Sequence, residues 1–326
     1  MIHLGGFGDV LLAVPAMVRL RTRFPKHWLV LCAEDQPAKL LLACGIIDAW
    51  NPVQGQSCAE LFAGADSVTG QLGVWLEDCD LAIGWIQDLD GKLSETLKLV
   101  GAREVIVKSP FSTTIQATLQ RDRFLEAISE APSDDAGDIL LTVPEHLLNL
   151  GRSCLEAEGL VIGQTLVVIH PGSGSTHKCV PPETTAALVI ALQASGVTPV
   201  VLEGPADREP VERLLQLCAD SPTVLRGLDI FTVAGVLPLA QLFVGQDSGI
   251  THMAGLMGVR TVAFFGPTDP NRWSPRGTHV TVVQGAPCHC QSWAAVSQCE
   301  NKPCLDISRD HLVALCLAHL KEAAIK

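Results

Sequence analysis

The chain contains no tyrosine, and this absence excludes one class of enzyme before any motif is considered. Epimerases that act on nucleotide sugars with an NAD cofactor need the tyrosine of a Tyr-x-x-x-Lys pair and a complete G-x-G-x-x-G loop. The sequence supplies neither of these features. Tyrosine-dependent chemistry of that kind is therefore ruled out.

The chain also has few positively charged residues. The 23 Lys and Arg residues face 35 Asp and Glu residues, so the formal net charge is -12, which argues against a nucleic-acid binder with a broad basic surface. No apolar run approaches the roughly 18–20 residues of a membrane span. The apolar stretch at 10–18 follows Asp9 instead of a basic region, so it does not have the pattern of a signal peptide. These features predict a soluble, cytoplasmic protein.

The chain has the length for two domains of roughly 150 residues each, and 48% of its 326 residues are hydrophobic. Strand-like and helix-like segments alternate in both halves, which predicts parallel sheets with helices on both faces. The expected strands are 1–4, 27–33, 80–85 and 104–108 in the first half and 165–170, 197–204, 242–247 and 260–266 in the second. Helical patterns at 183–195 and 208–218 separate strands of the second half. The sequence therefore predicts an α/β chain of two doubly wound, Rossmann-like domains with a cleft between them.

The best candidate for a linker is the polar stretch at 130–150, which contains both proline and glycine. We place the N-terminal domain at 1–144 and the C-terminal domain at 145–306. The last segment, 307–326, is expected to form a helix that packs back on the N-terminal domain.

The chemistry is expected at the carboxyl ends of the strands, where loops and helix N-termini converge in such sheets. Five of these ends carry glycine together with a polar or charged residue. The loops read GGFGD (5–9), PGSGSTHK (171–178), PADRE (205–209), DSGITH (247–252) and GPTDP (266–270).

Three of these loops bear on function, and each has a structural alternative. Asp9 stands at the predicted start of a helix, where it is either a functional carboxylate or an N-cap. Pro15 lies inside the same helical pattern and should bend the helix or leave one carbonyl unpaired. Gly172–Gly174 and Lys178 offer backbone N–H groups and a cation that suit a phosphate or diphosphate, unless they form a flexible solvent loop with an incidental lysine. The stretch 247–252 is either a binding site or a capped helix start with apolar residues at helical spacing.

Twelve cysteines occur, eight of them scattered singly among apolar residues, as in proteins of a reducing compartment. The other four, Cys288, Cys290, Cys299 and Cys304, cluster with a spacing that fits a tetrahedral thiolate site for zinc or iron. His289 and Glu300 are additional candidate ligands. Reduced cysteines or a disulfide are the alternatives.

Together these blocks resemble the signature segments of glycosyltransferase family 9, the heptosyltransferases that build the inner core of lipopolysaccharide. The segments that carry the resemblance are GDVLLAVPAMVRLRTRFP, HPGSGSTHKCVPP, GPADRE and VGQDSGITHMAGLMGVRTVAFFGPTDPNRWSP, in the family's order. The resemblance implies a GT-B fold in which the N-terminal domain takes the acceptor and the C-terminal domain takes a nucleotide sugar, commonly ADP-heptose. It also implies an inverting reaction that needs no metal. Some family members carry cysteine fingers near the position of the four clustered cysteines.

The resemblance assigns roles to individual residues on the donor side. The N–H groups of Ser248 and Gly249 would meet the diphosphate, with help from the helix dipole, and Asp247 would hold sugar hydroxyls. Lys178 would neutralise the charge on the leaving diphosphate. The remaining donor-side residues are His252 in the same pocket, Ser173 as a hydrogen-bond donor, His170 and Gly174 in the same loop region, Asp207 or Glu203 at the ribose, and Leu228 at the base.

On the acceptor side, the resemblance makes Asp9 the general base that takes the proton of the acceptor hydroxyl. Gly5, Gly6 and Gly8 form the loop around it. The chain departs from the family pattern in three respects. The strand before these glycines is shorter than usual, which fits an upstream start or a shortened chain, and His3 stands where a basic residue is common. Val180 occupies the position of the usual tryptophan after the lysine.

Other readings of function remain open. A sugar-nucleotide sensor with a decayed site would be expected to lose Asp9 or Lys178, and both are present. Within the family, a transferase that uses another nucleotide sugar or a protein acceptor, as in autotransporter heptosyltransferases, is the main alternative. The basic stretch of Arg19, Arg21, Arg23 and Lys26 fits a solvated helix end better than a patch for lipopolysaccharide phosphates or the inner membrane.

Overall fold

The computed structural model describes the chain except for residues 110, 112–118, 129–140, 162 and 325–326. It consists of two compact units, Met1–Ile139 (unit 1) and Leu140–Lys326 (unit 2). The division lies a few residues before the expected boundary at 144/145. Most of the first half of the expected linker, 130–150, lies outside the described residues.

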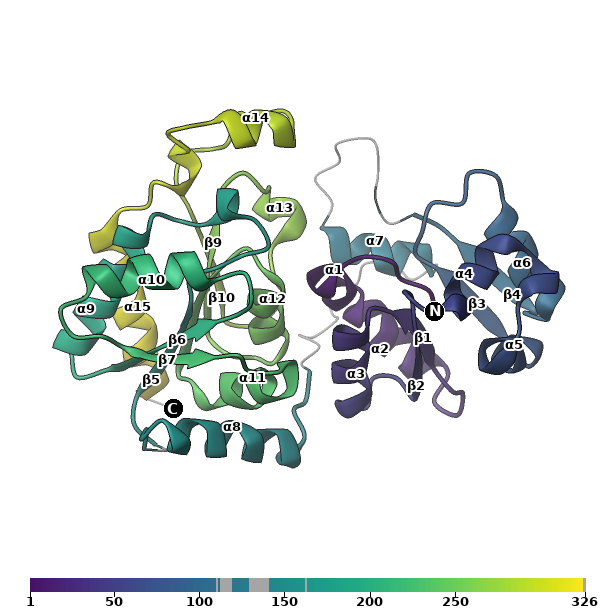
Figure 1. The fold of residues 1–326 in the computed structure, drawn as a ribbon, viewed down its shortest axis with the longest axis horizontal. Coiled ribbons are helices and arrows are strands. Elements are labelled where there is room, and N and C mark those ends of the chain that lie inside the picture. Colours follow the sequence, from purple (N-terminus) through teal and green to yellow (C-terminus); the bar gives the residue numbers. More distant parts are fainter. Residues whose placement is uncertain (110, 112–118, 129–140, 162, 325–326) are drawn as a thin grey trace. The chain divides into compact units, whose positions relative to one another are not determined.

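Unit 1 contains a parallel sheet (Figure 1). Its strands are β1 (Val30–Ala33), β2 (Ala49–Pro52), β3 (Leu81–Gly84) and β4 (Glu104–Val107). β1 pairs with β2 and β3 pairs with β4, while Ile2 joins the two pairs through bridges to Cys32 and Gly84. Within the described residues, the strand expected at 1–4 is present only as this bridge.

The helices of unit 1 alternate with its strands, as the sequence predicts. They are α1 (Phe7–Leu12), α2 (Val14–Arg23), α3 (Asp35–Ala43), α4 (Gln56–Ala63), α5 (Gly70–Glu77), α6 (Lys92–Val100) and α7 (Gln120–Ala127), with a short 3-10 helix η1 (Ala65–Ser67). Pro15 stands at the start of α2 and not inside one continuous helix, so the chain bends between α1 and α2. Proline is tolerated there because the first N–H groups of a helix have no partner within it.

Unit 2 is built on a six-stranded parallel sheet of order β10-β9-β8-β5-β6-β7. The strands are β5 (Leu166–His170), β6 (Thr198–Glu203), β7 (Thr223–Arg226), β8 (Leu242–Gln246), β9 (Thr261–Phe265) and β10 (Val280–Gln284). Every residue of β5, β8 and β9 is buried, which explains their continuous apolar sequences. The strand order reverses between β5 and β8, and such a reversal is where doubly wound sheets bind ligands.

Helices cover this sheet on both faces (Figure 1). They are α8 (Glu145–Ala157), α9 (Pro182–Ala194), α10 (Arg208–Leu217), α11 (Ile230–Val236), α12 (Gly249–Leu256), α13 (Pro270–Trp273), α14 (Trp293–Gln298) and α15 (Arg309–Ala324), with 3-10 helices η2 (Thr176–Lys178), η3 (Leu237–Leu239) and η4 (Pro303–Leu305). The helices expected at 183–195 and 208–218 correspond to α9 and α10. Among the helices described, none combines the length and the apolarity needed to span a bilayer.

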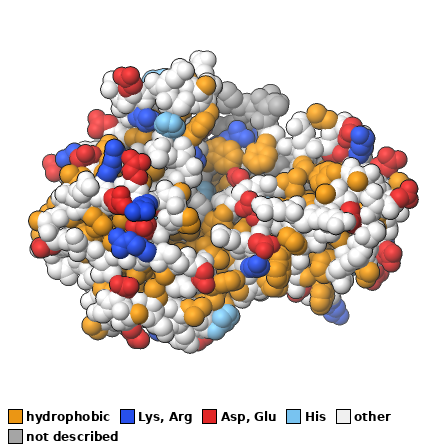
Figure 2. Space-filling model, viewed as in Figure 1, with side chains coloured by type: hydrophobic (Ala, Val, Ile, Leu, Met, Phe, Trp, Pro, Cys, Tyr) orange, Lys and Arg blue, Asp and Glu red, His pale blue; other side chains and the backbone are white. Residues whose placement is uncertain are grey.

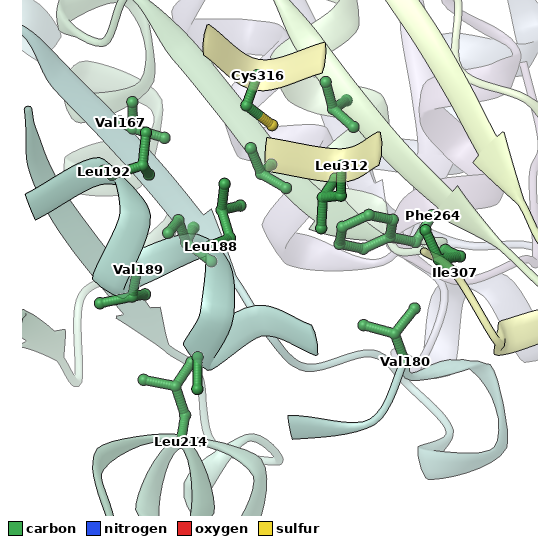
Figure 3. Close-up of a cluster of buried hydrophobic side chains, with 14 of the residues drawn as sticks. Val167, Val180, Leu188, Val189, Leu192, Leu214, Phe264, Ile307, Leu312 and Cys316 are labelled. Carbon is green, nitrogen blue, oxygen red and sulfur yellow. The ribbon is translucent and has the colours of Figure 1, made fainter. Parts of the chain in front are cut away.

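The C-terminal helix α15 is part of unit 2, and the expectation that 307–326 packs back on the N-terminal domain stays a prediction. Leu312 and Cys316, four residues apart on one face of α15, are completely buried in the cluster that also contains Leu188 of α9 and Phe264 of β9 (Figure 3). This i, i+4 pair gives α15 an apolar stripe that needs a partner surface. The adjoining layer of α9 and the sheet of unit 2 supplies that surface.

Candidate donor-binding site

The candidate site of unit 2 lies where β5 and β8 end side by side. His170 at the end of β5 is in register with Gly245 of β8, at the reversal of strand order. The loop after β5 leads through 171–175 to Lys178 in η2, and the chain after β8 leads through Asp247 into α12. Two loops that the sequence singled out are therefore neighbours in space.

Ser248 caps α12, which confirms the expected capped helix start. Its hydroxyl accepts a hydrogen bond from the N–H of Thr251 at 3.4 Å. The N–H of Gly249, the first residue of the helix, is one of the groups that have no partner inside a helix. These groups, with the positive end of the helix dipole, favour an anion beyond the N-terminus.

Lys178 and Asp247 join the two loops. The ammonium of Lys178 lies 2.8 Å from Oδ2 of Asp247, and the exposed fractions of the two side chains are 27% and 6%. The hydroxyl of Ser173 donates to the carbonyl oxygen of Asp247 at 2.6 Å. Lys178 therefore belongs to an organised arrangement and is not an incidental residue of an unattached loop.

His170 links the ends of three neighbouring strands. Its Nε2 lies 2.8 Å from Oδ2 of Asp207, after β6, and its Nδ1 lies 3.3 Å from Oγ of Ser248, after β8. Because a carboxylate only accepts, Nε2 is the donor to Asp207, and Nδ1 is the ring atom that contacts the Ser248 hydroxyl. The imidazole thus orients the hydroxyl that caps α12.

Asp207 contacts His170, and its expected contact with the ribose stays a prediction. The sequence places it at the ribose, but its side chain is buried, and Oδ2 is bonded to His170 and to the N–H of Gly204 at 2.9 Å. Burial opposes its negative charge, yet the bonds from His170 and Gly204 hold the pKa of Asp207 below its usual value. A Cβ on Gly172 would come within 1.6 Å of Oδ1, so the glycine is what lets the carboxylate pack here. Asp207 is thus a buried support for His170.

The other donor-side residues have varied surroundings. His252 is buried one turn along α12 from Ser248, and burial lowers its pKa to about 4, so its ring is neutral at pH 7. Glu203, the alternative to Asp207, pairs with Arg226 at 3.0 Å. Leu228 is half-buried after β7, and its contact with a base stays a prediction. A Cβ on Gly174 would have no atom within 4 Å, so open space adjoins that part of the loop.

In unit 1, Asp9 is the third residue of α1 and is partly exposed. The N-cap is Gly6, so the reading of Asp9 as an N-cap is wrong. Gly5 donates its N–H to Nδ1 of His3 at 3.1 Å, and a Cβ on Gly5 would lie 2.7 Å from the His3 ring and 2.8 Å from Cβ of Asp9. Gly5 is therefore a place where only glycine fits between the histidine and the aspartate. Gly8 precedes Asp9 within the same short helix.

His3 is held in an aromatic cluster below this loop. Its ring stacks on Phe124 at 5.4 Å between centroids and meets Trp85 edge-on at 6.2 Å. Burial lowers the pKa of His3 to about 4, so it supplies no positive charge at neutral pH. It therefore does not replace the basic residue that is common at this position in the family.

The four clustered cysteines lie around a cavity of about 470 Å³, which His289 also lines. Cys290 contacts Cys288 and Cys299, and Cys304 contacts Cys288; desolvation and these neighbouring thiols raise the pKa of Cys290 and Cys304. All four are free thiols in the structure, which therefore does not contain the disulfide that was one alternative. Although these thiols contact one another, no group of three or more His, Cys, Asp or Glu side chains among the described residues is arranged to hold a metal ion. The metal site stays a prediction.

The basic residues of α2 fit the helix-end reading. Arg21 pairs with Asp48 at 2.6 Å, and Arg23 in the last turn lies over the ring of Phe24 at 5.3 Å. On the face shown in Figure 2, basic and acidic side chains are intermixed among the described residues. Contact with a membrane stays a prediction.

A cavity of about 520 Å³ in unit 1 does not have Asp9 among its lining residues. It is lined mainly by apolar residues at the starts of β1 and β3, among them Val30 and Leu81, whereas the Gly5–Asp9 loop leaves from the opposite ends of the strands. The amino group of Met1 donates to the carbonyl of Val30 beside it at 2.8 Å, and burial lowers the pKa of that group. We assign no role in the chemistry to this cavity.

The fold of this chain is shared with solved glycosyltransferases. The chain resembles the crystal structure of a family 9 glycosyl transferase from Veillonella parvula, with a TM-score of 0.81, 19% identity, and coverage of 98% of this chain and 96% of that one. It also resembles the Escherichia coli ADP-heptose lipopolysaccharide heptosyltransferase II, with a TM-score of 0.75, 16% identity and coverage of 98% of each chain. Its two Rossmann-like units therefore have the GT-B glycosyltransferase fold.

The sequence pattern of glycosyltransferase family 9 (heptosyltransferase) matches residues 135–304, just over half of the chain. The protein belongs to that family. A curated relative, lipopolysaccharide heptosyltransferase 3 of Escherichia coli, is 36% identical over 118 residues, which is 35% of this chain and 35% of the relative. The match thus spans about a third of that relative's length. The family pattern includes every donor-side residue discussed above.

Proposed function

We propose that this protein is a heptosyltransferase that moves heptose from an ADP-activated donor to a lipopolysaccharide core acceptor, with inversion at the anomeric carbon and without a metal ion. The observation that carries the proposal is the arrangement at the ends of β5 and β8. There a lysine, a buried aspartate and the capped N-terminus of α12 converge at the reversal of strand order. Membership of family 9 supports the reaction class.

The donor diphosphate binds at the N-terminus of α12. The N–H groups of Ser248 and Gly249 and the open loop at Gly174 form its cradle, because they present backbone donors and have no bulky side chain in the way. Asp247 lies at the same place and accepts from the sugar hydroxyls. The adenine rests near Leu228, beyond the end of β7.

Lys178 supplies the positive charge for departure of the nucleotide. As the acceptor oxygen bonds to the anomeric carbon, the bond from that carbon to the phosphate oxygen breaks, and negative charge collects on the leaving ADP. An ammonium already held in place stabilises that charge without a costly rearrangement. This role makes a divalent cation unnecessary in the proposed reaction.

Asp9 takes the proton from the acceptor hydroxyl as its oxygen attacks. An unperturbed aspartate is a weak base, so its contribution depends on placement close to the hydroxyl. Gly5 and His3 fix the chain on one side of Asp9. The base and the leaving-group cation therefore come from different units of the chain.

His170 and Asp207 act as positioning residues in this proposal. Asp207 fixes the tautomer and orientation of His170, and His170 orients the Ser248 hydroxyl. Because Ser248 caps α12, its orientation fixes the backbone N–H groups at the start of the helix, which bind the diphosphate. The ribose contact that the sequence suggested for Asp207 stays a separate prediction.

The test is a transfer assay with ADP-heptose and a heptose-deficient lipopolysaccharide core, in buffer with EDTA and with Mg²⁺. The proposal predicts equal rates in the two buffers, a mass gain of one heptose on the acceptor, and inverted anomeric configuration by NMR. Transfer only from another nucleotide sugar, or only to a protein, would favour the alternative within the family. Binding of ADP without any transfer would favour a sugar-nucleotide sensor.

A further inference from the structure

A tryptophan from the cysteine-rich segment reaches the candidate donor site. The ammonium of Lys178 lies over the ring of Trp293 at 6.0 Å from the ring centroid. Trp293 is the first residue of α14 and is 49% exposed, which is unusual for so large an apolar side chain. Lys178 is thus in contact with the carboxylate of Asp247 and also lies over an exposed indole face.

The segment around Trp293 has its own anchoring contacts. The hydroxyl of Ser292 accepts from the N–H of Ala295 and so caps α14, and Val296 of the same helix is buried. The backbone before the segment is tied to the backbone after it, because Gly285 donates to the carbonyl of Cys304 at 3.0 Å. The cysteines flank α14 on both sides. The tryptophan is therefore presented by a supported helix.

The position of Trp293 has a physical consequence for Lys178. The face of an indole attracts a cation through its quadrupole, and it limits the directions in which a flexible lysine side chain can point. A lysine restricted in this way loses less conformational entropy when a phosphate binds. The exposed half of the ring also leaves an apolar wall next to the ammonium.

We infer that Trp293 is a positioning residue of the donor site, which holds the Lys178 ammonium ready for the diphosphate of a nucleotide sugar. The inference rests on the proposed function and assigns the cysteine-rich segment a role in donor affinity. Trp293 acts through Lys178, so its contribution depends on the presence of the lysine. It depends equally on an aromatic face at position 293.

The experiment is calorimetric titration of the full-length protein with ADP. The variants are Trp293→Ala, Trp293→Leu and Trp293→Phe, and the matched control is Trp28→Ala, which removes a 70% exposed tryptophan of unit 1. The Ala and Leu variants should bind ADP about two- to fivefold more weakly than the wild type, as expected for loss of a partly solvated cation–π contact. The Phe variant should recover most of the affinity, and Trp28→Ala should bind as the wild type does.

A second set of titrations uses the Lys178→Ala background. There Trp293→Ala should cause no further loss, because the tryptophan has no ammonium to hold. The inference is overturned if Trp293→Ala binds ADP as tightly as the wild type, or if it causes the same loss with and without Lys178. In both of those cases the wild type still binds ADP and the proposed function stands. A wild type that does not bind ADP overturns the proposed function together with the inference.

Discussion

Lys178 and Asp247 form an ion pair at 2.8 Å that joins the loop after β5 to the loop after β8. The two ends of the pair differ, since the lysine is 27% exposed and the aspartate only 6%. A buried carboxylate needs its cation, whereas a partly exposed ammonium is accessible to a second anion. The pair therefore contributes to the stability of unit 2 and to recognition of a diphosphate.

Replacement of Lys178 should lower both the stability of unit 2 and its affinity for a diphosphate, and a second substitution can separate the two effects. Lys178→Ala leaves the Asp247 carboxylate buried without its cation, so the free energy of unfolding should fall by about 1–3 kcal/mol. ADP affinity should fall about 10- to 100-fold. The double variant Lys178→Ala/Asp247→Asn should regain stability but not affinity. Thermal unfolding and calorimetry of the same samples check this, and equal recovery of both properties would contradict the assignment.

Asp9→Asn should abolish transfer and leave ADP binding nearly unchanged. A general base contributes about 10²–10⁴-fold to the rate, and Asp9 lies in unit 1, whereas the proposed donor contacts all lie in unit 2. Steady-state rates and ADP titrations check the two halves of the prediction. Asp66→Asn, which alters an exposed aspartate of the same unit, is the control. If Asp9→Asn keeps more than roughly a tenth of the turnover, another base must operate.

His252 should make the stability of unit 2 depend on pH. Its pKa is lowered to about 4 by burial, against about 6.5 in an unfolded chain, so the folded state favours the neutral ring. The stabilisation is complete above about pH 6.5 and is lost as the pH falls toward 4, over a total of a few kcal/mol. His252→Gln should flatten that part of the profile, and exposed His146→Gln should not. Urea unfolding between pH 4 and 7 measures this, and parallel profiles for wild type and His252→Gln would refute it.

The four clustered cysteines should bind up to one zinc or iron per chain when the protein is produced with the metals available. Cys299→Ser should then lower metal content and melting temperature together, because a short segment with little core of its own gains stability from a metal. Cys154→Ser, a single partly buried cysteine of the same unit, should change neither. Elemental analysis measures the metal content, and thermal unfolding measures the melting temperature. Metal-free protein whose melting temperature is unaffected by Cys299→Ser would show that the cysteines are ordinary thiols.

Much of the fold is predictable because its strands are strongly patterned. The buried strands β5, β8 and β9 are continuous apolar runs, and the sequence indicates them together with α9 and α10. Two of the strands that it missed, β2 (AWNP) and β7 (TVLR), are four-residue strands at sheet edges with little apolar signal. The third, β10 (VTVVQ), is rich in β-branched residues and could have been recognised.

The sequence indicates the loops of the candidate site but not which of their side chains contact one another. Glycine-rich strand ends identify the loops that carry Lys178 and Asp247, but the ion pair between them depends on β5 and β8 being neighbours. The same holds for His170, whose partners follow two other strands. The sequence suggests a ribose contact for Asp207, but nothing in it shows that the space beside Gly172 admits the carboxylate or that His170 is its partner. For Trp293 the sequence shows only a serine that can cap a helix, followed by a tryptophan. Nothing in that pattern indicates that the ring lies next to Lys178.

The expected cytoplasmic location and the contact with a membrane surface stay predictions. Arg21 of α2 forms an ion pair with Asp48, which supports a structural role for that arginine. Sedimentation with vesicles that contain anionic lipid would test the membrane contact directly.

The most direct test of the account is calorimetric titration of the wild-type protein with ADP and with NAD, each in the presence of EDTA. A lysine and a helix N-terminus that bind the diphosphate predict that ADP binds at least tenfold more tightly than NAD and that chelation leaves its affinity unchanged. Equal affinity for NAD, or loss of ADP binding on chelation, would contradict the claim that this site holds a nucleotide sugar by Lys178 and α12 without a metal.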